Sequence, residues 1–92
     1  MALYPKTVQE VLEACESYAL GTLGIETLKA RVWSASREVV AVEEKELRQL
    51  LMRSEAELDS IQFTTDDDKI FARSLGEVVT PLIAALKANL AA

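Results

Sequence analysis

The fold is decided by residues 25–61, which read IETLKARVWSASREVVAVEEKELRQLLMRSEAELDSI. Apolar residues recur through this stretch at spacings of three and four, the period of one face of an α-helix. No glycine or proline interrupts it. The stretch therefore predicts two successive helical stripes, formed first by Leu28, Val32, Ala35, Val39 and Val42 and then by Leu47, Leu50, Leu51, Ser54, Leu58 and Ile61.

Two arrangements of this stretch fit the same periodicity. One is a single helix through Ile61, about three times the average helix length. A chain of 92 residues could cover the ends of so long a helix only by packing on a second copy, so this arrangement predicts a dimer. The other is a pair of helices that part at residues 39–42, where β-branched valines weaken helix propensity. We favour the pair.

The residues before this stretch predict a first helix from about Val8 to Leu20. Thr7 and Glu10 have the spacing of a capping box, in which a hydroxyl and a carboxylate satisfy the first free amides of a helix. Gly21 can adopt the left-handed conformation that ends a helix. Because the connection that follows is short, we expect the first two helices to form an antiparallel hairpin.

The residues after the stretch predict a further helix and a terminal restart. The sequence Thr64-Thr65-Asp66-Asp67-Asp68 supplies hydroxyls and carboxylates that cap a helix start and complement its dipole. Pro81 lacks an amide hydrogen and its ring clashes with the preceding turn, so the helix must kink or restart there. We favour a restart with Thr80 as the cap and Pro81 as the first helical residue.

Composition and charge narrow the class of protein. The chain is 50% hydrophobic and 27% charged, which is typical of a globular domain. We expect a single all-α domain over residues 1–92, a small antiparallel bundle of about four to five helices. The net charge of −5 has the wrong sign for binding phosphates, so no nucleic-acid partner is expected. Neither a signal peptide nor a membrane-spanning run is present, and we expect a cytoplasmic protein without a membrane partner.

The residue inventory also restricts the chemistry. Histidine is absent and Cys15 is the single cysteine, which excludes histidine-activated nucleophiles, an internal disulfide and a structural zinc site. Cys15 lies on the apolar face of the first predicted helix, where burial makes a thiol inert. The run Asp66–Asp68 lacks the alternating ligands and the glycine of a calcium loop. We expect no metal, no cofactor and no enzymatic activity.

Carboxylates on the helix that follows the break form one candidate binding surface. A rotation of about 100° per residue brings Glu44, Arg48, Glu55 and Asp59 to one flank. Glu44 and Arg48 are spaced to pair, whereas Glu55 and Asp59 are like charges that stay unneutralised. This flank is either a solvated face or an acidic surface for a basic partner.

Trp33 is the second candidate. It lies about 140° around the helix from the first apolar stripe, next to Val40, so it does not face the main seam. Lys29 and Arg37 lie one turn to either side, within reach of cation–π contact with the indole ring. Either this helix is packed on both sides and Trp33 faces a second neighbour, or Trp33 and Arg37 form an exposed anchor for a partner.

Two segments of the chain resemble a family of binding proteins. The sequences EEKELR at Glu43–Arg48 and SEAELDSIQF at Ser54–Phe63 are similar to small bacterial immunity proteins of contact-dependent growth inhibition and related toxin systems. The resemblance implies a cytoplasmic protein that binds a cognate toxin domain, often a nuclease, and blocks its active site. It carries over no family contact positions.

The sequence therefore favours a small acidic protein-binding inhibitor, an immunity protein that neutralises a basic toxin domain. Its candidate contact residues are Trp33, Arg37, Glu44, Glu55 and Asp59. The alternative is a homodimeric helical adaptor that buries a self-complementary surface around Trp33 and Val40. The two differ in self-association, because an inhibitor is expected to be soluble alone whereas an adaptor associates with itself as its concentration rises.

Overall fold

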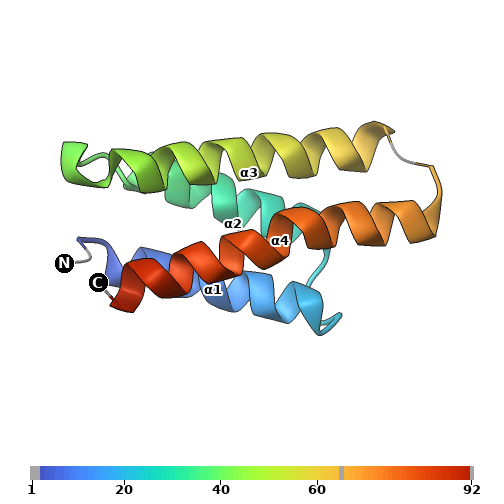
Figure 1. Ribbon diagram of the computed structural model, residues 1–92, viewed down its shortest axis with the longest axis horizontal. Helices are drawn as coiled ribbons and strands as arrows, with labels where there is room; N and C mark the ends of the chain where they lie inside the picture. The colour runs from blue at the N-terminus through green and yellow to red at the C-terminus, as the bar shows by residue number, and fades with distance from the viewer. Residues whose placement is uncertain (1–2, 65, 92) are drawn as a thin grey trace.

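The computed structural model describes residues 3–64 and 66–91, and these residues form helices and no strands. The helices run up and down in the bundle shown in Figure 1. The predicted all-α class is confirmed. The elements are α1 (Pro5–Ala19), α2 (Ile25–Glu38), the short 3-10 helix η1 (Val42–Glu44), α3 (Lys45–Thr64) and α4 (Asp68–Ala91).

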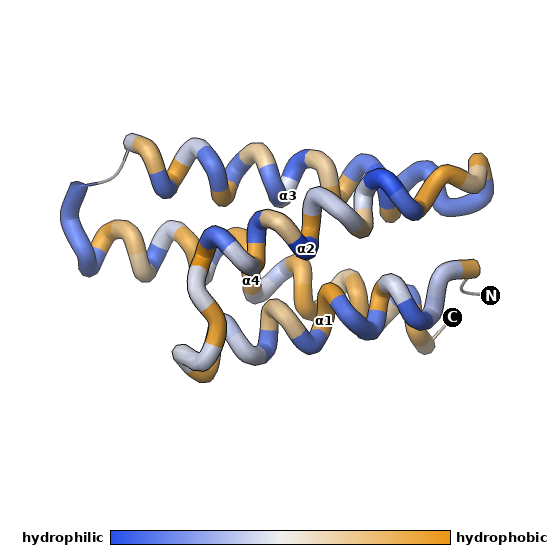
Figure 2. Tube along the Cα trace, turned by 180° about the vertical axis from the view of Figure 1, so that it is seen from behind, coloured by the Kyte–Doolittle hydropathy of each residue, from blue (hydrophilic) through white to orange (hydrophobic). Residues whose placement is uncertain are grey.

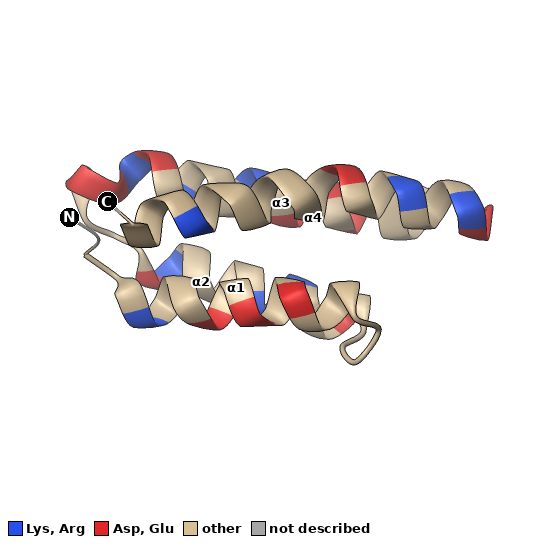
Figure 3. Cartoon of the chain, turned by 60° about the horizontal axis from the view of Figure 1, so that its bottom comes forward, with Lys and Arg blue, Asp and Glu red and all other residues tan. Residues whose placement is uncertain are grey.

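The four long helices pack as a closed ring. Each successive pair is in contact, and α4 closes the ring by packing on α1. The α3–α4 hairpin is longer than the α1–α2 hairpin and extends beyond it at one end (Figures 1 and 2). Figure 3 shows acidic residues near the start of α3 and at the tip where α4 begins. Because α3 packs on both α2 and α4, each of its two flanks runs along a neighbouring helix.

The core is built from the predicted apolar stripes except at Val42, which lies in the turn after the break and is 81% exposed. Hydrophobic positions recur among polar ones along each helix (Figure 2), and those that face inward are withdrawn from water, which is the main source of folding free energy. Cys15 belongs to this core, as predicted. The buried hydrophobic side chains are Val8, Val11, Leu12, Ala14, Cys15, Leu28, Val32, Ala35, Val39, Leu47, Leu51, Leu58, Leu75, Val78, Val79, Leu82 and Leu86.

The break between α2 and α3 occurs where it was predicted. Helix α2 ends at Glu38, and the chain is extended at Ala41 before η1 begins. Tyr4 stabilises this break, because its hydroxyl oxygen accepts hydrogen bonds from the amides of Val40 (3.3 Å) and Ala41 (3.0 Å). The amides freed by ending the helix thus keep partners. The single long helix does not form, so the argument for a dimer that rested on its length no longer applies.

The predicted start of α1 is wrong. The helix begins at Pro5, whose fixed φ angle and missing amide suit the first helical position. Thr7 is therefore already inside the helix, and its hydroxyl donates to the Glu38 carboxylate at 2.9 Å instead of forming a capping box. This bond joins α1 to the end of α2. The end of α1 agrees with the prediction, since Gly21 has a φ of 82°.

The start of α4 is capped by one member of the predicted run. Asp67 Oδ1 accepts hydrogen bonds from the amides of Lys69 (2.9 Å) and Ile70 (3.1 Å). These contacts satisfy two of the free amides in the first turn of the helix. Thr64 instead ends α3, where its hydroxyl donates to the carbonyl of Ser60. The predicted capping role of Thr65 lies outside the described residues.

The predicted restart at Pro81 is wrong. Helix α4 continues through Thr80 and Pro81 to Ala91 as one element. Leu82 and Leu86 are buried at the same helical period as the residues before the proline, so core packing holds the helix in register across it. Pro81 and Glu77 are both exposed, and water can therefore hydrate the Glu77 carbonyl that the missing amide leaves free.

Candidate functional site

Trp33 lies on the outer side of α2 and is half-exposed, with 50% of its surface accessible. Arg37 covers part of the ring, because its guanidinium carbon lies 4.8 Å from the centre of the indole. This is a cation–π contact between residues one turn apart. The interpretation in which Trp33 is buried against a second helix is wrong, because the helices around α2 leave half of the indole in solvent.

Lys29 contacts different groups from those predicted. Its ammonium lies 5.0 Å from the centre of the Phe63 ring. It also donates to Asp59 Oδ1 at 2.7 Å and to Gln62 Oε1 at 2.6 Å, which joins α2 to the end of α3. Asp59 is therefore neutralised by Lys29, and the expectation of an unneutralised pair with Glu55 is wrong. Among the described residues, Lys29 makes its cation–π contact with Phe63 and not with Trp33.

A shallow depression lies beside Trp33, between α2 and α3. Its volume is about 600 Å³ and it is lined by Glu26, Lys29, Ala30, Trp33, Ser34 and Glu55. The structure thus brings Trp33, Arg37, Glu55 and Asp59 to one side of the bundle, together with Lys29. We call these five residues the α2/α3 surface. Its cations and carboxylates are mixed, so it is not the acidic flank that the sequence predicted.

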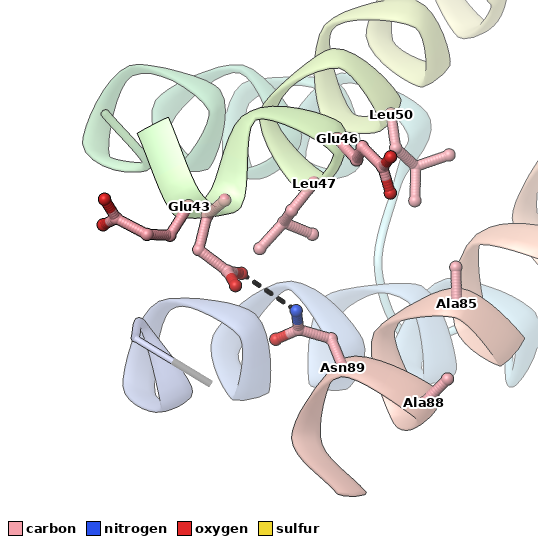
Figure 4. A pocket seen from close by; sticks show the side chains of 8 residues that line it. Glu43, Glu46, Leu47, Leu50, Ala85, Ala88 and Asn89 are labelled. Carbon is pink, nitrogen blue, oxygen red and sulfur yellow. Dashed lines mark hydrogen bonds between the residues drawn. The ribbon is translucent and has the colours of Figure 1, made fainter. Parts of the chain in front are cut away.

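Glu44 does not belong to this surface. It lies in η1, before α3 begins, and its Oε2 accepts a hydrogen bond from Asn89 Nδ2 at 2.9 Å. The dashed line in Figure 4 marks this contact with α4. No ion pair between Glu44 and Arg48 occurs in the described part of the chain. The helical rotation that grouped Glu44 with Glu55 assumed one continuous helix, and the 3-10 turn breaks that assumption.

The sequence did not reveal the Lys29 contacts. Thirty positions separate Lys29 from Asp59, so only the antiparallel register of α2 against α3 brings them together. The sequence could have revealed them only through a comparison of oppositely charged residues that face each other when the two predicted helices are aligned antiparallel. Phe63 was also missed as a functional residue, although it is 74% exposed and lies against Lys29.

The described residues include one thiol, that of Cys15, and it is buried. Burial, and then the nearby charge of Glu16, raise the pKa of the Cys15 thiol to about 11. At neutral pH the thiol is therefore protonated, a form that is a poor nucleophile. Within residues 3–64 and 66–91, no group of three acidic or cysteine side chains is arranged to hold a metal ion. No helix in this part of the chain is long and apolar enough to cross a membrane.

Comparison of the chain with models of protein families, with curated proteins and with solved structures gives no match. Its function is therefore inferred from the residues of its own surface.

Proposed function

We propose that this chain is a small protein-binding inhibitor whose α2/α3 surface contacts its partner through Trp33. The observation that carries the proposal is the half-exposed indole with Arg37 stacked on it. Tryptophan and arginine are the residue types most enriched among interface hot spots. Because the stacking already restricts both side chains, ordering them on binding costs less conformational entropy.

The surroundings of Trp33 support a protein partner with basic groups. Glu55 lines the depression beside the indole, and no described residue forms an ion pair with it. Asp59 keeps half of its side-chain surface exposed although it binds Lys29. A basic side chain of the partner can therefore enter beside Trp33 and meet Glu55. The net charge of −5 favours the approach of such a partner at long range.

Inhibition follows if the partner surface covered by Trp33 is its active site. The resemblance of Glu43–Arg48 and Ser54–Phe63 to immunity proteins supports this mode of action, with a bacterial toxin domain as the partner. Trp33, Arg37, Glu55 and Asp59 are the proposed contact residues. Glu44 is removed from this set because it points toward α4.

The test is capture of the partner by the tagged protein, followed by affinity measurements on purified components. Trp33→Ala is expected to weaken binding by at least about tenfold, as truncation of a hot spot does. The free energy of unfolding should fall by only about 1 kcal/mol, because half of the ring is already exposed. Leu20→Ala is the matched control, since Leu20 is 80% exposed at the α1–α2 connection.

Charge reversal at Glu55 separates electrostatic steering from packing. Glu55→Lys is expected to slow association and to reduce its dependence on salt. Glu55 is a better choice than Asp59, because replacing Asp59 also breaks the contact with Lys29. If the captured partner binds both Trp33→Ala and Glu55→Lys as tightly as the parent, the proposal is wrong.

A homodimeric adaptor is the second candidate function. It is favoured by the mixed charges of the α2/α3 surface, because cations and carboxylates on one face can pair across a twofold axis. Sedimentation velocity over a range of concentrations distinguishes the two. An inhibitor stays monomeric, whereas an adaptor forms a dimer that Trp33→Ala dissociates.

A further inference from the structure

A second surface lies on the opposite flank of α3, where this helix meets α4. A depression of about 340 Å³ opens there, as Figure 4 shows. Its floor is apolar where the methyl groups of Ala85 and Ala88 on α4 lie beside the leucines of α3, and the polar Asn89 of α4 lies at its rim. Its rim carries three carboxylates. The lining residues are Glu43, Glu44, Glu46, Leu47, Leu50, Ala85, Ala88 and Asn89, none of which is basic.

The same pattern recurs farther along the seam between α3 and α4. A depression of about 480 Å³ is lined by Glu57, Ser60, Ile61, Ser74, Glu77 and Val78. It again combines apolar side chains with carboxylates at the edge. Equivalent lining residues of the two depressions lie eleven positions apart, Leu50 and Ile61 on α3 and Ala88 and Glu77 on α4. Eleven positions are three helical turns, or about 16 Å.

The carboxylates of this seam are largely free to meet an external cation. Among the described residues only Glu57 has an ion-pair partner here, Arg53, at 3.8 Å with both side chains mostly exposed. Such an exposed pair holds its partners weakly. Glu44 is fixed at the rim by the bond from Asn89 Nδ2, so its carboxylate is oriented before any ligand arrives.

We propose that the seam between α3 and α4 is a docking groove for a basic amphipathic α-helix of another protein. Residues eleven apart in an α-helix return to nearly the same face. A helix laid along the seam therefore places one lysine or arginine in each depression, with small apolar residues facing the seam between the two depressions. This is the helix-in-groove mode of recognition, and charge complementarity defines the occupant. The groove is independent of Trp33, because it lies on the other flank of α3.

The probe is a fluorescently labelled alanine-rich helical peptide that carries two arginines eleven residues apart. Fluorescence anisotropy at low salt should show binding to the full chain. A control peptide of the same composition has the arginines nine residues apart, which puts them on opposite faces of its helix. It should bind at least about tenfold more weakly, because only one depression can be filled at a time.

Matched variants locate the binding site. Glu46→Gln with Glu57→Gln removes two carboxylates from the groove, and Glu26→Gln with Glu55→Gln removes two from the other flank. The first pair should weaken peptide binding by at least about tenfold, and the second pair should change it little. Ala88→Leu fills the groove at an exposed position without changing the charge, and it should also weaken binding.

Amide chemical shifts of the labelled protein give the footprint of the peptide. Leu50, Ile61, Ala85 and Ala88 should shift on titration, whereas the indole of Trp33 should not. The proposal is overturned if both glutamine pairs weaken binding equally, if the shifts centre on Trp33, if the parent does not bind at low salt, or if a second copy of the chain occupies the seam in solution. None of these results bears on the inhibitor function, which is tested separately at Trp33.

Discussion

The two flanks of α3 are closed in different ways, although one helix supplies both. On the α2 side, Lys29 reaches across the seam and bonds to Asp59 and Gln62. On the α4 side, Ala85 and Ala88 are too short to cross the seam, and Asn89 reaches only Glu44 in η1. The result is a surface of mixed charge with an exposed indole on one flank and an acidic groove on the other. The shape and charge of each flank therefore depend on the length and charge of the side chains that the neighbouring helix places against α3.

Leu58→Ala is expected to give the largest loss of stability, because it truncates a core side chain of α3, the helix that both flanks share. Leu58 is fully buried in the middle of the bundle. The free energy of unfolding is expected to fall by about 3 kcal/mol, from lost transfer free energy and the cavity that remains. Urea denaturation followed by circular dichroism measures it. Met52→Ala on the same helix, at a side chain that is 52% exposed, should change stability by less than about 0.5 kcal/mol. A similar loss in both variants would contradict the assigned core.

Alkaline pH is expected to weaken the core through its one thiol, that of Cys15. Folding raises the pKa of Cys15 from its ordinary 9.0 to about 11, so its contribution is fully present below pH 9.0 and is lost as pH rises toward 11. The loss amounts to about 2 to 3 kcal/mol. Burial raises the pKa of Tyr18 as well, which acts in the same direction. Urea denaturation at several pH values measures the loss, and Cys15→Ala should flatten the profile. An unchanged profile in that variant would show that the thiol is not responsible.

Pro81→Ala is expected to stabilise α4, which forms one wall of the acidic groove. The substitution restores an amide that can donate to the Glu77 carbonyl and removes the clash of the proline ring, a gain of about 2 kcal/mol. Thermal and urea denaturation check it. Thr80→Ala is the companion variant, because a helix that restarted at Pro81 would lose its cap and about 1 kcal/mol. In the continuous helix, Thr80→Ala should leave the free energy of unfolding unchanged. A loss of about 1 kcal/mol would instead indicate that the helix restarts at Pro81.

Double-mutant cycles compare the ion pairs of the two flanks, where we expect the smallest effects. Lys29→Met with Asp59→Asn should give a coupling of about 1 kcal/mol, since Lys29 is only 15% exposed although solvent screens the half-exposed Asp59. The Arg53–Glu57 pair is longer, at 3.8 Å, and exposed at 69% and 51%. The cycle of Arg53→Met with Glu57→Gln should give less than about 0.5 kcal/mol. Equal couplings would show that the Lys29–Asp59 bridge between α2 and α3 is no stronger than an exposed pair within α3.

The helical architecture was predictable from local pattern. The apolar stripes of residues 25–61 predicted the helical segments α2 and α3, because a helical period is readable wherever one face must be buried. The β-branched valines at 39–42 predicted the break between them. The burial of Cys15 followed from its position on such a stripe. The predicted helix start at Thr7 and the predicted restart at Thr80 are both wrong, because a capping sequence does not show which tertiary contacts compete with the cap. Thr7 bonds to Glu38 of another helix, and core packing carries α4 through Thr80.

The candidate site was predictable only in part. Trp33 and Arg37 are four positions apart on one helix, so their stacking followed from the sequence. The predicted grouping of Glu44 with Glu55 and Asp59 is wrong. It applied the rotation of an α-helix to Glu44, which lies in a 3-10 helix. The partner of Asp59 lies on another helix, and no local spacing could identify it.

What the sequence determined by itself was therefore the set of helices and the side of each that is buried. Both depend on contacts within a few residues and on the separation of apolar from polar side chains along one helix. The tertiary structure decided which helices lie together, which carboxylate is neutralised and which is left at the edge of a groove. These properties depend on the register and side-chain reach of helices distant in sequence: Lys29 bridges α2 to α3 on one flank, whereas Ala85 and Ala88 are too short to bridge α4 to α3 on the other.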